Sequence, residues 1–139
     1  MFKTDSTRIA TLDLSFTDMS SAAATRLFAS LKGYPSLIHL SLEGNNLQNS
    51  VFGSAFVGFV KTQKKLQFLN MAGCNIQEEA GALIGQGLER NNTLRKLVLA
   101  QNSIGEKGAI AIATALMNDS LPIASLDLSS NHISEGGGL

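Results

Sequence analysis

The sequence predicts a single α/β domain built as a solenoid, in which short parallel strands alternate with helices. Two observations carry this prediction: one spacing of apolar residues recurs five times, and each of the first four copies is followed by a helix-forming segment. The copies begin at residues 9, 37, 66, 94 and 123, so successive starts lie 28 or 29 residues apart. Because five registers agree over nearly the whole chain, residues 1–139 are expected to form one domain.

The first half of each copy has the alternation of a short, half-buried strand. The copies read IATLDLSFTDM, LIHLSLEGNNL, LQFLNMAGCNI, LRKLVLAQNSI and IASLDLSSNHI. In the second copy, Leu40 and Leu42 are expected to face the core. Their neighbours His39, Ser41 and Glu43 are expected to face outward. Each copy therefore supplies one strand, about five in all, and strands joined through helices run parallel.

The second half of each copy is helix-forming. The segments are SSAAATRLFASL, SVFGSAFVGFVK, QEEAGALIGQGLER and GEKGAIAIATALMN. In the last segment, one apolar face is predicted to consist of Ile110, Ala113 and Leu116 or Met117. Gly81, Gly108 and Gly137 share one repeat position early in the helical half, where a missing side chain would let helix and strand approach closely.

The complete pattern, L-x-x-L-x-L-x-x-N/C-x-L, resembles that of leucine-rich repeats. The 28/29 alternation and the helical second halves are similar to the ribonuclease-inhibitor-like subfamily. That subfamily includes ribonuclease inhibitor, RanGAP, the CARMIL-type and tropomodulin-type actin regulators, and the repeat regions of NOD-like receptors. The resemblance implies a right-handed β-α superhelix, a segment of a horseshoe with strands on its concave face and helices on its convex face.

The ninth position of the repeat is expected to form a structural ladder. It is occupied in turn by Thr17, Asn45, Cys74, Asn102 and Asn131, and so departs from the strict Asn and Cys alternation of the subfamily. At this position the chain leaves the strand, and a small polar side chain turned inward can satisfy backbone groups left unpaired by the bend. The only cysteine, Cys74, is therefore interpreted as part of the framework and not as a nucleophile.

Several other classes of site are disfavoured by the sequence. Eleven basic and eleven acidic residues balance, which argues against binding to nucleic acid or to an anionic membrane. Asp13, His39 and Ser41 have the composition of a hydrolytic triad, but a flat strand surface supplies no oxyanion hole. No cofactor, metal site or catalytic residue is expected, since His39 and His132 occupy different repeat positions and the glycines after Gly81 do not fit a phosphate-binding loop.

The predicted function is binding of another protein through the concave face. The family resemblance implies an actin regulator, a small GTPase or an immune-type ligand as kinds of partner, and a RanGAP-like GTPase-activating protein as the alternative function. Outward aromatic and polar residues of the middle strands suit such an interface. The expected partner-binding residues are His39, Ser41, Glu43, Phe68, Asn70, Lys96 and Val98.

The two ends of the sequence lack the polar caps that a solenoid normally needs. The chain is therefore interpreted as a piece of a longer repeat region. Apolar residues near the last strand, Ile123, Leu126, Leu128 and Ile133, are expected to be partly open, so self-association through uncapped ends is expected. A single cysteine and the absence of a secretory signal favour the reducing cytosol, or the nucleus, as the compartment.

Overall fold

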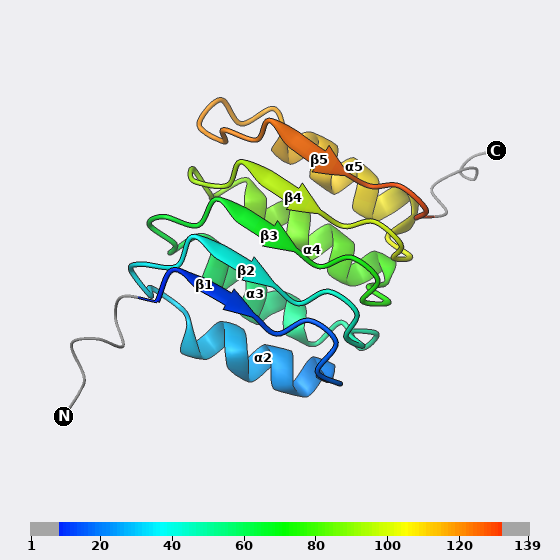
Figure 1. Ribbon diagram of the computed structural model, residues 1–139. Coiled ribbons are helices and arrows are strands. Elements are labelled where there is room, and N and C mark those ends of the chain that lie inside the picture. Colours follow the sequence, from blue (N-terminus) through cyan, green and yellow to red (C-terminus); the bar gives the residue numbers. More distant parts are fainter. Residues whose placement is uncertain (1–8, 132–139) are drawn as a thin grey trace.

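Five short strands form one parallel sheet in the computed structural model, which describes residues 9–131 (Figure 1). The strands lie side by side in the order of the sequence, β1 to β5. This arrangement confirms the predicted α/β solenoid, because each repeat places its strand beside that of the preceding repeat. The strands are β1 (Thr11–Asp13), β2 (His39–Ser41), β3 (Phe68–Asn70), β4 (Lys96–Val98) and β5 (Ser125–Asp127).

The four helices of the described chain all cover the same face of the sheet (Figure 1). Helix α2 begins where the Ser20 side chain accepts a hydrogen bond from the Ala23 amide, the usual arrangement of a serine N-cap. None of the described helices is long and apolar enough to cross a membrane. The helices are α2 (Ser21–Ser30), α3 (Phe52–Val60), α4 (Glu78–Leu88) and α5 (Gly105–Ala115).

The strands pair without any shift between equivalent repeat positions. Leu40 of β2 lies beside Leu12 of β1 and Leu69 of β3, and this leucine row continues through Leu97 and Leu126. Within this row the leucines of β2, β3 and β4 are fully buried, whereas those of β1 and β5 are half-buried. Ile123 and Leu128 are also half-buried, while Ile133 lies outside the described residues.

Aromatic side chains fill the space between the first two helices and the sheet. Phe28 of α2 packs against three phenylalanines of α3, with ring centroids 5.0 to 6.3 Å apart. The pair with Phe56 is edge-on, which is a favoured aromatic geometry. These rings supply the bulk that fixes the spacing of α2 and α3.

Helices α4 and α5 approach more closely because glycines line their contact. A Cβ atom on Gly81 would lie 3.4 Å from the Gly108 Cα atom, and one on Gly85 would lie 2.5 to 2.7 Å from atoms of Ala111. The sequence had suggested that Gly81 and Gly108 bring a helix close to a strand. That interpretation was wrong, because the surfaces in contact belong to two neighbouring helices. Gly137 lies outside the described residues.

The buried side of α5 also differs from the predicted one. It is formed by Gly108, Ile112 and Ala115, whereas Ile110 is 58% exposed and Met117 is 80% exposed. The i, i+3 spacing predicts that the stripe through Ile110 and Ala113 is buried. The close contact with α4 instead buries the side of α5 that carries the small residues Gly108 and Ala115. Ile112 is the large apolar side chain on the buried side, whereas Ile110, Leu116 and Met117 face solvent.

Gly85→Ala is expected to lower the free energy of unfolding by about 1 to 3 kcal/mol, because the new methyl group would overlap the backbone of α5. The matched control is Gly58→Ala in α3, where a Cβ atom meets only Lys32 side-chain atoms at 3.9 Å. The control should stabilise the protein by about 0.5 to 1 kcal/mol through higher helix propensity. Urea denaturation of both variants measures the difference.

Candidate functional site

The sheet face opposite the helices, which we call the concave face, presents two aligned columns of side chains. Residues that pair across the strands in the described register are neighbours in each column, at about the 4.8 Å strand spacing. One column lies at the start of each strand and the other two residues later. The first contains Thr11, His39, Phe68, Lys96 and Ser125, and the second Asp13, Ser41, Asn70, Val98 and Asp127.

Phe68 lies at the centre of the first column and contacts both of its neighbours. Its ring centroid is 4.1 Å from that of His39, and the Lys96 ammonium nitrogen lies 5.4 Å from the same centroid. A cation at this distance over an aromatic ring is attracted by the negative ring face. The two contacts restrict the rotation of Phe68 while leaving it only half-buried.

The second column places Asn70 beside Glu43 from the preceding repeat. The Asn70 Nδ2 atom donates a hydrogen bond of 3.3 Å to Glu43 Oε1, and the Asn70 Oδ1 atom accepts one of 3.0 Å from the Ala72 amide. Val98 is half-buried beside Asn70. This part of the concave face therefore joins a charged, an amide and an apolar side chain.

Ser41 differs from the other residues predicted on the concave face. Ser41 is only 5% exposed, and its hydroxyl oxygen lies 2.7 Å from the Ser15 hydroxyl oxygen. Ser41 does lie in the outward column of the sheet, but contacts of its Oγ atom with the Ser15 hydroxyl and the Glu43 amide leave it almost without exposed surface for a partner. Its hydroxyl also makes no bond to His39, so the acid, base and hydroxyl considered from the sequence are not assembled as a triad.

The concave face is negative at both of its edges. Hydrogen bonds from the Ser15 side chain and backbone lower the pKa of Asp13, and equivalent bonds from Ser129, backbone first, lower the pKa of Asp127. Both carboxylates are therefore ionised at neutral pH. They lie on β1 and β5, the opposite edges of the sheet, which rules out joint action as a catalytic pair.

Asparagines at the ninth repeat position connect each turn to the one before it. Asn102 Oδ1 accepts hydrogen bonds of 2.9 Å from the amides of Cys74 and Ile76, while its Nδ2 atom donates to the carbonyls of Met71 and Leu99. Asn45 makes the same four kinds of bond two repeats earlier. One buried side chain thus satisfies four backbone groups in two repeats.

Cys74 occupies the same position with fewer bonds. Its Sγ atom donates to the Leu42 carbonyl at 3.0 Å, and its side chain is 0% exposed. Burial raises the pKa of Cys74 to about 11, partly opposed by the backbone amides of Asn45 and Gly44. A thiol of this kind is almost entirely protonated at neutral pH and is therefore a poor nucleophile. Thr17 and Asn131 complete the ladder, with bonds to the Leu14 and Leu99 carbonyls respectively.

A second ladder of amide side chains lies at the other end of the strands, in the helix-to-strand connections, where the sequence suggests only breaks between helix and strand. The Nε2 or Nδ2 atoms of Gln63, Asn91 and Asn118 donate at 2.9 to 3.0 Å to carbonyls at the end of the helix one repeat earlier, those of Leu31, Val60 and Glu89. The recurrence of an amide residue three positions after the ends of three helices was the signal in the sequence.

Sequence reasoning also missed an exposed aromatic residue in the turn that follows β1. Phe16 is 71% exposed and has a φ angle of 54°, and its ring lies over Gly44, where a Cβ atom would collide with it. The equivalent residue has a positive φ angle in every repeat, including Gly73, Gln101 and Ser130. The turn requires this left-handed conformation, which glycine adopts readily and phenylalanine does not.

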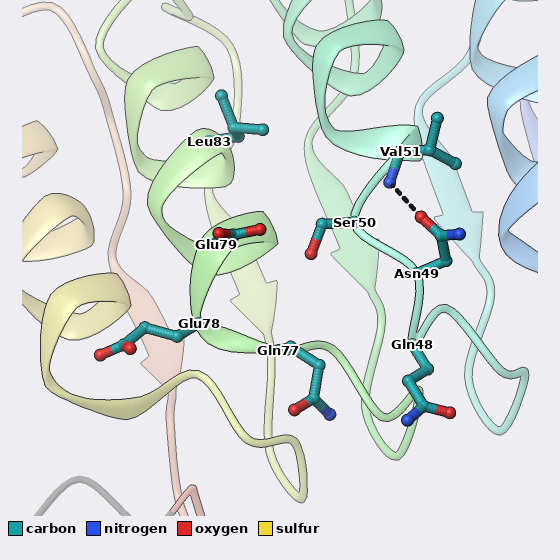
Figure 2. A pocket seen from close by; sticks show the side chains of 8 residues that line it. All are labelled: Gln48, Asn49, Ser50, Val51, Gln77, Glu78, Glu79 and Leu83. Carbon is teal, nitrogen blue, oxygen red and sulfur yellow. Dashed lines mark hydrogen bonds between the residues drawn. The ribbon is translucent and has the colours of Figure 1, made fainter.

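An open pocket of about 600 Å³ lies away from the concave face, between the first turns of α3 and α4 (Figure 2). Figure 2 shows Val51 and Leu83 at its apolar end and Gln77 and Gln48 at the other, with the Val51 amide bonded to the Asn49 side chain. Glu78 at its edge accepts a hydrogen bond from the Lys107 amide. Within residues 9–131 no three His, Cys, Asp or Glu side chains are grouped so that they could hold a metal ion.

The repeated strand and helix, the buried leucine rows and the asparagine ladder define a leucine-rich repeat solenoid. Residues 90–113 and 123–139 match a family model described as Leucine Rich repeat. The repeats are therefore leucine-rich repeats, and they are similar to the repeats of NOD-like receptors.

Three relatives illustrate that similarity. The chain is 29% identical over 111 residues to NACHT, LRR and PYD domains-containing protein 3 of Macaca mulatta and 28% identical over 111 residues to that of Homo sapiens, with 80% of this chain aligned in both. It is 26% identical over 121 residues, 86% of its length, to NACHT, LRR and PYD domains-containing protein 2 of Homo sapiens. The aligned segment spans 11% of each relative. These relatives give no support to the RanGAP-like alternative.

Asn102→Ala is expected to lower the free energy of unfolding by about 3 kcal/mol or more, because four backbone groups would lose their partner in a buried site. Asn92→Ala, at an exposed position two residues before the strand repeat begins, is the matched control and should change stability by less than about 0.5 kcal/mol. Thermal unfolding followed by circular dichroism compares them. Equal losses for the two variants would contradict the role assigned to the ladder.

Cys74→Ala should cost about 1 to 2 kcal/mol, from a weak hydrogen bond and a small cavity. In the native protein, the Cys74 thiol should react with an aromatic disulfide reagent far more slowly than free cysteine, since it is buried and protonated. Adding a denaturant should restore the ordinary rate. Rapid labelling of the folded protein would show that the thiol is accessible.

Proposed function

We propose that the chain is a protein-interaction module that binds a partner protein through the concave face. The observation that carries the proposal is the ring of Phe68, held half-exposed at the centre of the sheet between His39 and Lys96. A preorganised aromatic side chain loses little conformational freedom on binding, and such residues frequently dominate the energy of an interface.

The surroundings of Phe68 favour a polypeptide as the ligand. Glu43, Asn70 and Lys96 offer an acceptor, an amide and a cation within neighbouring strands, while Val98 adds apolar surface. This mixture of an aromatic centre and a polar rim is typical of protein interfaces. The two pockets described, of about 600 and 470 Å³, are both lined by residues around the first turns of the helices and lie away from the concave face. We therefore infer binding and not catalysis as the function of this surface.

The family of the chain supports a protein ligand in general terms. An immune-type ligand is the proposed class, because the relatives combine leucine-rich repeats with NACHT and PYD domains. The proposed compartment is the cytosol or the nucleus, where the thiol of Cys74 would stay reduced.

Phe68→Ala should weaken binding of a captured partner by about 1 to 2 kcal/mol while leaving the melting temperature nearly unchanged, because no core cavity is created. Lys96→Glu should act mainly through a slower association rate and an altered salt dependence. The partner would be isolated by affinity capture from the source cell, and both variants measured by surface plasmon resonance.

Arg26→Glu on the outer surface of α2 is the control, since its side chain is exposed and distant in the fold from the concave face. It should bind the partner normally. If Phe68→Ala and Lys96→Glu also bind normally while changes on the helices abolish binding, the interaction surface is on the convex side.

A further inference from the structure

Charges are segregated in this solenoid although the sequence balances them. The helix-to-strand connections all lie along one edge of the molecule, on the left in Figure 1. Of the nine lysine and arginine residues in the described part of the chain, six lie in the three connections that precede β2, β3 and β4. All six are exposed, and we call them the basic rim: Lys32, Lys61, Lys64, Lys65, Arg90 and Arg95.

Few negative groups accompany the basic rim. Glu89 and Asp119 are the acidic residues of the described connections on this edge, whereas Glu78, Glu79 and Glu106 lie in the first turns of helices at the opposite edge. No lysine or arginine of residues 9–131 makes an ion pair within 4.0 Å with a described acidic residue. The six positive charges therefore add to one another and are not neutralised locally.

Helix dipoles account for only part of this separation. They favour acidic residues in first turns, where α4 and α5 have them, and basic residues in last turns. None of the four described helices carries a basic residue in its last turn. The dipole effect falls off within one turn, and half of the basic rim, Lys64, Lys65 and Arg95, lies beyond that distance in the connections. Stabilisation of the helices is therefore not a sufficient reason for the basic rim.

We propose that the basic rim is a second interaction surface, which binds an acidic segment of a partner protein. Successive connections belong to adjacent strands, so the six cations form a row that crosses the strand direction and suits an extended chain. Exposed Ile38, beside the row at the start of β2, adds a point of apolar contact. This surface is separate from the concave face and does not depend on the function proposed for it.

A protein segment fits the basic rim better than other polyanions do. Single-stranded nucleic acid is held by aromatic stacking, but the aromatic residue of these connections, Tyr34, is half-buried and its hydroxyl accepts a hydrogen bond from the Ile9 amide. A membrane-bound surface combines positive charge with several apolar side chains that enter the lipid. In the three connections that carry the basic rim, Ile38 is the exposed large apolar residue, while exposed Leu116 and Met117 belong to the next connection, which holds no cation.

The test compares two variants with the same change of net charge. Lys65→Gln/Arg95→Gln removes two cations of the basic rim, and Arg26→Gln/Lys107→Gln removes two exposed cations elsewhere. The probe is a fluorescein-labelled deca-glutamate peptide, and its binding is measured by fluorescence anisotropy between about 20 and 200 mM salt, which spans a large change in screening. Circular dichroism melting checks that both variants stay folded.

Saturable binding that weakens with salt, and that falls at least about fivefold in the rim variant but not in the control, would support the proposal. Absence of binding at low salt, or equal losses in both variants, would overturn it. A single-stranded oligonucleotide of ten residues and vesicles of phosphatidylcholine with phosphatidylserine are the competing ligands. Tighter rim-dependent binding to either would assign the basic rim to that polyanion. Rim-dependent self-association in sedimentation would assign it to a second copy of the chain, and each of these outcomes would refute an acidic protein segment as its ligand.

Discussion

The solenoid depends on one constraint: every repeat bends the chain sharply at the end of a strand and must satisfy the backbone groups that the bend exposes to the core. Asn45 and Asn102 meet this requirement by joining amides and carbonyls of two adjacent repeats. Because each bond set spans two repeats, it fixes the strand register as well as the turn. The leucine rows, the sheet and the columns of the concave face follow from that register.

A single side chain satisfies four backbone groups only where its own amide has both donors and acceptors available. Cys74 can replace asparagine because its thiol donates to the Leu42 carbonyl, and its own backbone carbonyl accepts the hydrogen bond of the Leu47 amide at 2.7 Å in place of a side-chain oxygen. The second ladder, through Gln63, Asn91 and Asn118, ties the end of each helix to the helix-to-strand connection of the next repeat. Hydrogen bonds from amide side chains thus hold the chain at both ends of the strands. The residues of the concave face are therefore free to vary.

Interaction surfaces on such a framework arise from residues that the framework does not need. Phe68 contributes nothing to the leucine rows, yet its neighbours hold it in place. Phe16 occupies a turn position that glycine would fill with less strain, and Gly44 provides the space for its ring. The charged residues of the connections likewise point away from the core. The repeat therefore separates stability, which is carried by inward positions, from recognition, which is carried by outward ones.

The sequence by itself determined the repeat, the five strands, the inward leucines and the position of the ladder, because these follow from local spacing that recurs every 28 or 29 residues. Only the tertiary structure decided that Ser41 is buried against Ser15, that glycines bring α4 onto α5, and that the cations collect on one edge. Those outcomes depend on contacts between different repeats. Periodicity assigns each side chain to a face, but the packing of neighbouring repeats determines what that side chain meets there.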